Sequence, residues 1–125
     1  MDSKQYGPAG ERACARRLRE KGYRILCANY RTRFGELDMI AQQGPYIVFV
    51  EVKTRGPHAI AAPMEAVTPA KQRRLMRTAE LYLAAHPSAL QPRFDVMEVE
   101  MDGEGHVTAL RHLENAFDAQ EEGDF

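Results

Sequence analysis

The spacing of hydrophobic residues changes along the first half of the chain from that of a helix to that of strands. In residues 3–21 apolar side chains recur every three or four positions, and Gly22 is placed to end the helix that this spacing predicts. Polar turns are expected at residues 30–35 and 43–45. The short apolar or alternating runs around these turns predict three strands, at residues 23–29, 36–42 and 46–53.

The second half of the chain predicts one more helix and two more strands. Residues 54–67 contain a glycine and two prolines and predict a loop. Thr68 and Pro69 are typical of the N-cap and first turn of a helix, whose apolar stripe ends near residue 86. The last two predicted strands cover residues 93–101 and 107–113.

The resulting order, α-β-β-β-α-β-β, predicts an α/β fold in which helices flank one mixed sheet. A chain of 125 residues is long enough for one compact domain and too short for two ordinary ones. We assign residues 1–114 to this domain and residues 115–125 to an acidic, disordered C-terminal tail. The composition, 44% hydrophobic and 28% charged, is typical of a folded protein.

The sequence predicts neither a membrane span nor a secretory signal. Its apolar runs are far shorter than the roughly 18 residues that a spanning helix needs. Two cysteines, Cys14 and Cys27, are too few for a disulfide framework or a zinc site. We therefore expect a cytoplasmic protein with reduced thiols and no membrane partner.

Charge is distributed unevenly, although the formal net charge is only -1. Residues 1–55 contain 11 lysines and arginines and 6 acidic residues, whereas residues 56–125 contain 6 and 12. A cationic N-terminal half is compatible with binding to a phosphate backbone. A solvated helix face would produce the same pattern.

The predicted strand at residues 46–53 ends in a pair of charged side chains. Side chains alternate between the two faces of a strand, so Glu51 and Lys53 share one face with Phe49. If the preceding strand folds back with Gln42 opposite Ile47, Asp38 lies opposite Glu51. The same register places Glu36 opposite Lys53, whereas a shift of one residue would move Asp38 to the other face.

Two carboxylates and a lysine are what metal-assisted hydrolysis of a phosphodiester requires. Mg²⁺ is bound in proteins by one or two carboxylates, with water and substrate phosphate completing the shell. A lysine can orient the attacking water or stabilise charge on the phosphoryl oxygens. The simpler interpretation is a salt bridge from Lys53 to Glu51 or Glu36, and the sequence alone leaves both open.

The two strands also carry a family resemblance. Residues 35–41 (GELDMIA) and 48–55 (VFVEVKTR) resemble the signature of the YraN-type family, a bacterial branch of the PD-(D/E)XK nuclease superfamily related in fold to archaeal Holliday junction resolvases. The similarity covers most of the chain, with further matching positions at Gly7, Gly10, Glu11, Ala15, residues 29–31, Lys71 and residues 93–96. Leu37 stands where the superfamily motif has proline, which contributes no ligand.

The resemblance implies a restriction-endonuclease-like sheet and a Mg²⁺ or Mn²⁺ site. By this similarity Asp38 and Glu51 are the metal ligands and catalytic acids, and Lys53 is the catalytic lysine. Glu11 resembles a glutamate that related nucleases place at the metal from their first helix. A solvated glutamate near a helix N-terminus is an equally simple interpretation of Glu11.

Four basic residues are candidates for contacts with DNA phosphates. Arg31, Arg33 and Arg55 flank the predicted carboxylates in the sequence, and Lys71 begins a basic cluster on the second predicted helix. Three functions remain open. The first is a metal-dependent nuclease acting on DNA, with branched DNA as one candidate substrate, and the second is a catalytically silent nucleic-acid-binding module. The third is a protein-interaction domain without DNA affinity. The sequence does not fix the oligomeric state, and a homodimer is compatible with it.

Overall fold

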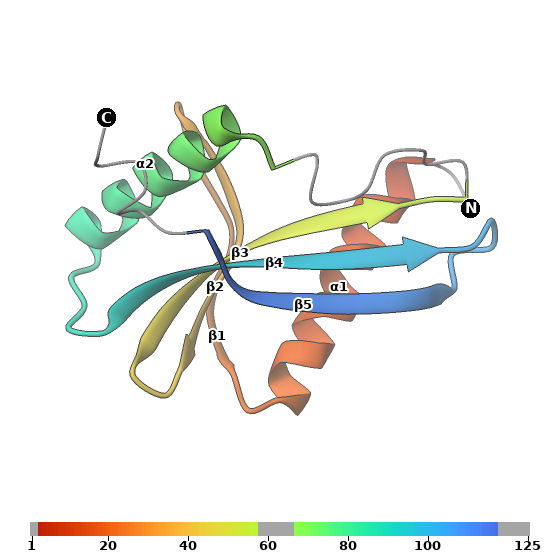
Figure 1. Cartoon of the computed structure of the whole chain (residues 1–125), viewed down its shortest axis with the longest axis horizontal. Helices are drawn as coiled ribbons and strands as arrows, with labels where there is room; N and C mark the ends of the chain where they lie inside the picture. The colour runs from red at the N-terminus through yellow and green to blue at the C-terminus, as the bar shows by residue number, and fades with distance from the viewer. Residues whose placement is uncertain (1–2, 58–66, 118–125) are drawn as a thin grey trace.

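A five-stranded sheet lies between two helices in the part of the chain that the structure, a computed structural model, describes: residues 3–57 and 67–117 (Figure 1). The elements in chain order are α1 (Ser3–Glu20), β1 (Arg24–Thr32), β2 (Gly35–Gln43), β3 (Tyr46–Arg55), α2 (Pro69–Ala85), β4 (Gln91–Met101) and β5 (Val107–Phe117). The predicted α/β class and the order α-β-β-β-α-β-β are confirmed.

The strands lie in the sheet in the order in which they occur in the sequence. β3 and β4 are parallel, whereas the other neighbouring strands are antiparallel, so the sheet is mixed. Two parallel neighbours require a long crossover connection, and α2 lies within that crossover. The crossover therefore brings α2 back over one face of the sheet (Figure 1).

The two helices cover opposite faces of the sheet, and β3 is buried between them. Phe49 of β3 packs with Leu75 of α2, whereas its neighbour Val50 packs with Leu18 of α1. Because alternate residues of a strand point to opposite faces, both faces of β3 must be apolar along this stretch. The apolar run ends at Glu51, as the sequence predicted.

Several strands are longer than the sequence predicted. β1 continues to Thr32, which reduces the polar turn expected at residues 30–35 to Arg33 and Phe34. The reason is the β1–β2 ladder, which continues through Arg31↔Glu36 to Thr32↔Gly35. β3 likewise extends to residue 55, while residues 58–66 of the predicted loop lie outside the described residues.

The C-terminal end of the sheet corrects the expected domain boundary. β5 ends at Phe117, so the assignment of residues 115–117 to a disordered tail is wrong. The physical reason is that the Phe117 ring is buried and stacks on Phe94, with ring centroids 5.1 Å apart. Residues 118–125 of the predicted tail lie outside the described residues.

A buried polar network joins β4 to β5. Asp95, only 1% exposed, accepts hydrogen bonds from Arg93 at 2.9 Å, from His112 at 2.7 Å and from the backbone N–H of Asn115 at 3.0 Å. Burial alone would raise the pKa of Asp95, but these donors outweigh burial and the pKa is lowered. The network fixes the outer half of the sheet and takes no part in the site described below.

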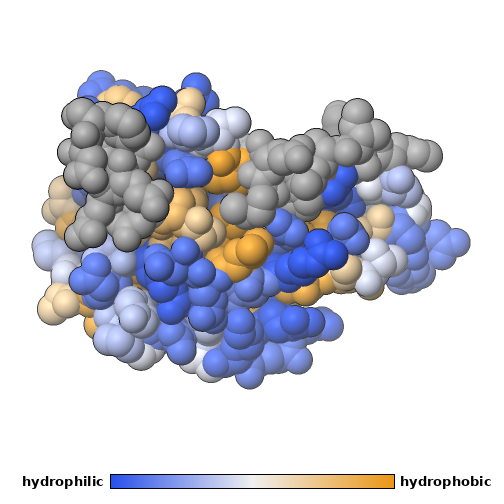
Figure 2. All heavy atoms as spheres, in the orientation of Figure 1, coloured by the Kyte–Doolittle hydropathy of each residue, from blue (hydrophilic) through white to orange (hydrophobic). Residues whose placement is uncertain are grey.

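Hydrophilic side chains cover most of the face seen in Figure 2, with apolar residues visible in a central strip.

None of the described helices has a stretch that is long and apolar enough to cross a membrane.

α1 lies unusually close to the end of β3 because of Gly10. A Cβ atom at position 10 would overlap the side chain of Thr54. The missing side chain therefore lets the backbone of α1 approach β3. Glu11, the next residue, is brought by the same contact toward the charged end of that strand.

We predict that Gly10→Ala destabilises the protein because the added methyl group must displace Thr54. Overpacking of this kind costs about 1–3 kcal/mol. The matched control is Gly7→Ala in the same helix, where nothing lies within 4 Å of the added carbon. Helix propensity alone makes that variant neutral or more stable by up to about 1 kcal/mol. Urea unfolding measures both, and equal stability of the two variants would contradict the proposed close approach.

Candidate functional site

β2 and β3 separate at Asp38, where the candidate site begins. The predicted register of the hairpin is confirmed by the pairs Gln42↔Ile47 and Ile40↔Phe49. The ladder ends at Met39↔Val50. One residue further, the Asp38 side chain takes the place of a backbone partner: its Oδ2 accepts a hydrogen bond from the N–H of Val52 at 2.7 Å.

The expected ladder pair between Asp38 and Glu51 is therefore wrong, although the two carboxylates do lie close together. Regular alternation would place Leu37 on the same face as Met39, but Leu37 packs into the other core cluster, beside Ile40. Burying Leu37 there breaks the alternation at Asp38 and ends the pairing. Asp38 thus lies in the gap between the two strands.

The predicted pairing of Glu36 with Lys53 is also absent. Glu36 lies opposite Arg31 in the β1–β2 ladder instead, and its Oε1 is 3.4 Å from Nε of that arginine. The reason is the same departure of β2 from β3, which leaves Glu36 with β1 alone. Lys53 forms its ion pair with Glu51 instead.

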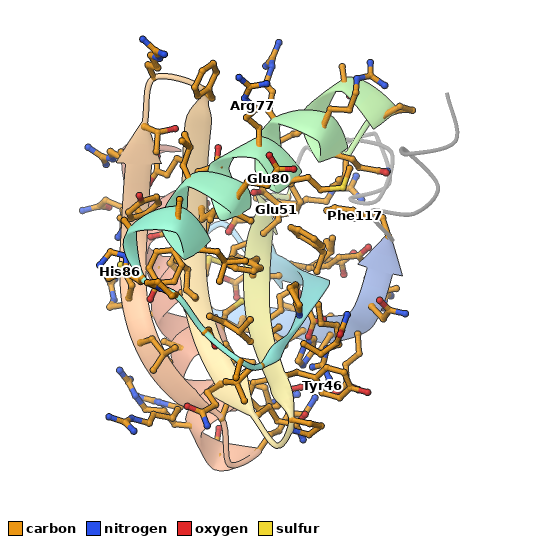
Figure 3. The ribbon with its side chains drawn as sticks, turned by 90° about the vertical axis from the view of Figure 1, so that its left-hand side faces the viewer. Tyr46, Glu51, Arg77, Glu80, His86 and Phe117 are labelled. Atoms are coloured by element: carbon orange, nitrogen blue, oxygen red, sulfur yellow. The ribbon has the colours of Figure 1, made fainter. Side chains whose placement is uncertain are left out.

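Glu51 is a buried carboxylate that is held by two lysines. It is 7% exposed and lies on β3 beneath α2 (Figure 3). Its Oε1 is 3.1 Å from Nζ of Lys53 and 3.0 Å from Nζ of Lys71, which comes from the first turn of α2. The predicted shared face of Glu51 and Lys53 is confirmed, and so is the salt bridge that was the simpler interpretation of this pair.

The two lysines are not equivalent. Burial lowers the pKa of Lys53, and the neighbouring Lys71 lowers it further. Burial also lowers the pKa of Lys71, but the carboxylates of Glu51 and Asp38 outweigh that effect, so its pKa is raised.

Asp38 has a strongly perturbed carboxyl group. Burial, followed by the charge of Glu51, raises its pKa from 3.8 to about 7, against the opposing effect of the Val52 hydrogen bond. Burial also raises the pKa of Glu11, and Glu36 adds to this effect. A hydrogen bond with Asp38 opposes the shift of Glu11. Asp38 therefore has a carboxylate neighbour on α1 and another on β3.

A cleft of about 250 Å³ opens onto this cluster. It is lined by Phe34, Gly35, Glu36, Asp38, Glu51, Lys71, Arg74 and Leu75. Across residues 3–57 and 67–117, no three or more His, Cys, Asp or Glu side chains are grouped so that they could hold one ion. An ion held by Asp38 and Glu51 would thus depend on water and a bound anion for its other ligands, which is usual for Mg²⁺.

The four predicted phosphate-binding residues lie in different places. Arg31 is 75% exposed and paired with Glu36, and Lys71 is engaged with Glu51. Arg33 lines a second hollow beside the cleft. Arg55 lines a separate small hollow at the end of β3. The structure therefore places Lys71 in the cleft, Arg33 in the adjoining hollow and Arg55 apart from both, and the roles of these residues stay predictions.

Phe34 and Arg74 also line the cleft, although the sequence analysis did not assign them to the site. Arg74 belongs to the basic cluster of the second helix, for which the sequence favours a solvated cationic face over phosphate contacts. Phe34 lies in the polar turn that the sequence predicts. An aromatic side chain beside an arginine, here Arg33, is common in surfaces that bind single-stranded nucleic acid. That signal was available in the sequence.

Comparison with known proteins reveals one family. The family model described as "Uncharacterised protein family UPF0102" matches residues 10–99. A UPF0102 protein of Symbiobacterium thermophilum is 52% identical over 118 residues, which cover 94% of this chain and 99% of that protein. UPF0102 proteins of Caldicellulosiruptor saccharolyticus and Alkaliphilus metalliredigens are 41% and 44% identical, over 94% and 92% of this chain and 100% and 99% of theirs. The range 10–99 that the family model matches spans Glu11, Asp38, Glu51, Lys53 and Lys71.

We predict that Asp38→Asn stabilises the folded protein at pH 8 when divalent cations are removed by EDTA. Among the described residues no lysine or arginine forms an ion pair with Asp38, whose buried charge lies beside Glu51 and is attracted by Lys71 only from beyond ion-pair distance. Because the pKa of Asp38 is raised to about 7, its stabilising contribution is complete below about pH 4 and is lost as the pH rises through 7. A shift of about three pKa units sets an upper limit of about 4 kcal/mol on the gain at pH 8.

Urea unfolding between pH 4 and pH 8 measures this effect. The difference between Asp38→Asn and the unchanged protein should shrink toward pH 4. Glu80→Gln, which removes an exposed carboxylate from α2, is the control and should follow the unchanged protein at every pH. A loss of stability in Asp38→Asn at pH 8 would show that the ionised Asp38 carboxylate does not destabilise the folded protein.

Proposed function

The chain belongs to the uncharacterised protein family UPF0102, and from its charged cleft we propose that it is a metal-dependent nuclease that hydrolyses phosphodiester bonds of DNA. The observation that carries this proposal is the buried carboxylate of Asp38 beside Glu51, with which no described lysine or arginine forms an ion pair, together with a lysine at the same strand end. A structural salt bridge needs one acid and one base. It does not need a second buried carboxyl group such as Asp38, whose pKa is raised by the charge of Glu51.

The residues of the cleft fit a Mg²⁺ or Mn²⁺ ion. Carboxylate oxygens are the ligands that these hard cations prefer, and Asp38 and Glu51 would hold the ion. Both lysine contacts of Glu51 are made to Oε1, so Oε2 is the oxygen with which it would bind a cation. Such an ion, when bound, polarises the phosphoryl group and lowers the pKa of a bound water.

The remaining side chains of the cluster position water and phosphate. Lys53 Nζ, whose pKa is lowered, can exchange a proton with the attacking water or donate to a phosphoryl oxygen. Lys71 keeps its proton and neutralises Glu51 between turnovers. Asp38, whose pKa is raised to about 7, can hold a proton and donate it in a hydrogen bond to the carboxylate of Glu11.

The substrate that we propose is DNA, with branched DNA as one candidate form. Lys71 and Arg74 line the cleft itself, and Arg33 lines the hollow beside it, so cationic groups surround the two acids. Such groups bind phosphates without regard to base sequence. We also propose that the protein acts in the cytoplasm, where chromosomal DNA of bacteria is found.

A catalytically silent DNA-binding module is the second candidate. It is favoured by one observation: Lys53 and Lys71 already neutralise Glu51, so the cluster is stable without a metal. The two candidates share the basic surface and differ in whether the acids bind a cation. A protein-interaction domain without DNA affinity differs from both, because it would show no salt-dependent DNA binding.

We predict that the protein cleaves DNA with Mg²⁺ or Mn²⁺ and that Lys53→Ala lowers the cleavage rate on the order of a hundredfold or more. The same variant should lose only about 0–1 kcal/mol of stability, because Lys53 is partly exposed and Lys71 still neutralises Glu51. DNA affinity should remain close to that of the unchanged protein. Cleavage is measured on branched and linear DNA, and stability by urea unfolding.

Lys21→Ala is the control for the loss of one lysine. Lys21 is also ion-paired, with Glu114 at 3.5 Å, but it does not line the cleft. Its removal should leave cleavage unchanged. If Lys53→Ala unfolds at much lower urea and its folded fraction still cleaves DNA, Lys53 is a structural residue. If neither metal supports cleavage of any DNA form, the silent module is the better account.

A further inference from the structure

A second hollow adjoins the acidic cleft and has different chemistry. It has a volume of about 540 Å³ and is lined by Arg33, Phe34, Ala70, Arg73, Arg74 and Arg77. We call these six residues the arginine groove. Phe34 and Arg74 line both hollows, so the groove leads directly into the cleft. Among the described residues no acidic one lines the groove, whereas two glutamates and an aspartate line the cleft.

The groove is formed by the tip of the β1–β2 hairpin and the first turns of α2. Figure 3 shows Arg77 projecting from α2 toward the end of the molecule where that hairpin tip lies. The tip itself is held by side-chain hydrogen bonds: Thr32 Oγ1 accepts from the N–H of Phe34 at 3.1 Å and donates to the carbonyl of Gly35 at 3.2 Å. Phe34 therefore has a defined position at the mouth of the cleft.

Phe34 lies against two guanidinium groups. The guanidinium carbon of Arg33 is 4.9 Å from the centre of the Phe34 ring, and that of Arg77 is 4.6 Å away. Cations over an aromatic face are attracted by the ring and keep their charge available to an anion. The half-buried ring thus forms the floor of a cationic site rather than part of the core.

Three of the four groove arginines have no carboxylate partner in the described part of the chain. Arg33, Arg74 and Arg77 form no ion pair with any carboxylate of residues 3–57 and 67–117, in contrast to Arg31 and Arg111. Three guanidiniums this close repel one another. An anion in the groove would remove that repulsion.

An aromatic ring flanked by arginines matches an unpaired nucleotide better than a bare phosphate. The guanidiniums can bind phosphate oxygens, and a base can stack on Phe34 or on an arginine plane. In a B-form duplex the bases are stacked inside the helix and offer no free face to Phe34. We propose that the arginine groove binds an unpaired nucleotide of DNA next to the cleft, so that the substrate contains a single-stranded segment or a branch point.

This inference rests on the proposed function for the identity of the substrate, but it can be tested without cleavage. Binding of a labelled single-stranded oligothymidine and of a blunt duplex is measured by fluorescence anisotropy in EDTA. Phe34→Leu keeps an apolar side chain at the hairpin tip but removes the stacking face. It should weaken single-strand binding by about 5- to 150-fold, the effect of losing one stacked base, and change duplex binding by no more than about twofold.

Two further variants separate stacking from charge. Phe34→Trp restores a stacking face and should bind the single strand within about twofold of the unchanged protein. Arg77→Gln should weaken binding to both DNA forms and reduce the salt dependence by about one counterion. The matched control is Arg16→Gln on the exposed side of α1, away from the groove, which should change neither.

The binding and cleavage results together distinguish the unpaired-nucleotide site from the nuclease proposal. Equal weakening of single-strand and duplex binding by Phe34→Leu, no weakening of either, or no single-strand binding by the unchanged protein would overturn the unpaired-nucleotide site. If that site fails while Mg²⁺ still supports cleavage, the nuclease proposal stands alone. If Phe34→Leu behaves as expected but no metal supports cleavage, the groove belongs to a silent DNA-binding module.

Discussion

Burial of the Asp38 carboxylate beside Glu51 is the interaction on which the rest of the site depends. Two carboxylates close together repel each other, and burial removes the water that would screen them. The fold offsets part of this cost, because the Val52 N–H donates to Asp38 and two lysines neutralise Glu51. No ion pair from the described residues neutralises Asp38. A divalent cation would supply that missing charge, and this requirement connects the fold to the proposed chemistry.

The site exists only in the folded chain because its parts come from four different elements. Separation of β2 from β3 provides the gap for Asp38, and the crossover between parallel strands brings Lys71 over Glu51. The close packing at Gly10 brings Glu11 of α1 toward the same place from the opposite face of the sheet. The hairpin tip and α2 then extend the acidic cleft into a basic groove. Acids that could hold a metal and arginines that could hold a phosphate backbone are thus adjacent.

Sequence reasoning succeeded where the structure depends on local periodicity. Alternation along one strand is enough to place Glu51 and Lys53 on one face, and the hairpin register was correct as far as Met39. It failed at the next pair because Leu37 packs into the core beneath α2. This tertiary contact cannot be predicted from the alternation of side chains along one strand. The contact of Lys71 with Glu51 was missed for a similar reason, since the path of a crossover helix depends on the whole sheet. The helix and strand order needed only the pattern, whereas the geometry of the cleft needed the fold.

The central claim is that Asp38 and Glu51 bind one divalent cation, and anomalous diffraction from crystals soaked in Mn²⁺ tests it most directly. We expect an anomalous peak within coordination distance, about 2.1 Å, of a carboxylate oxygen of each residue. We also expect that Asp38→Asn removes the peak without changing the backbone around it. A structure in which Mn²⁺ binds elsewhere or not at all, while Lys53 and Lys71 both remain on Glu51, would contradict the claim.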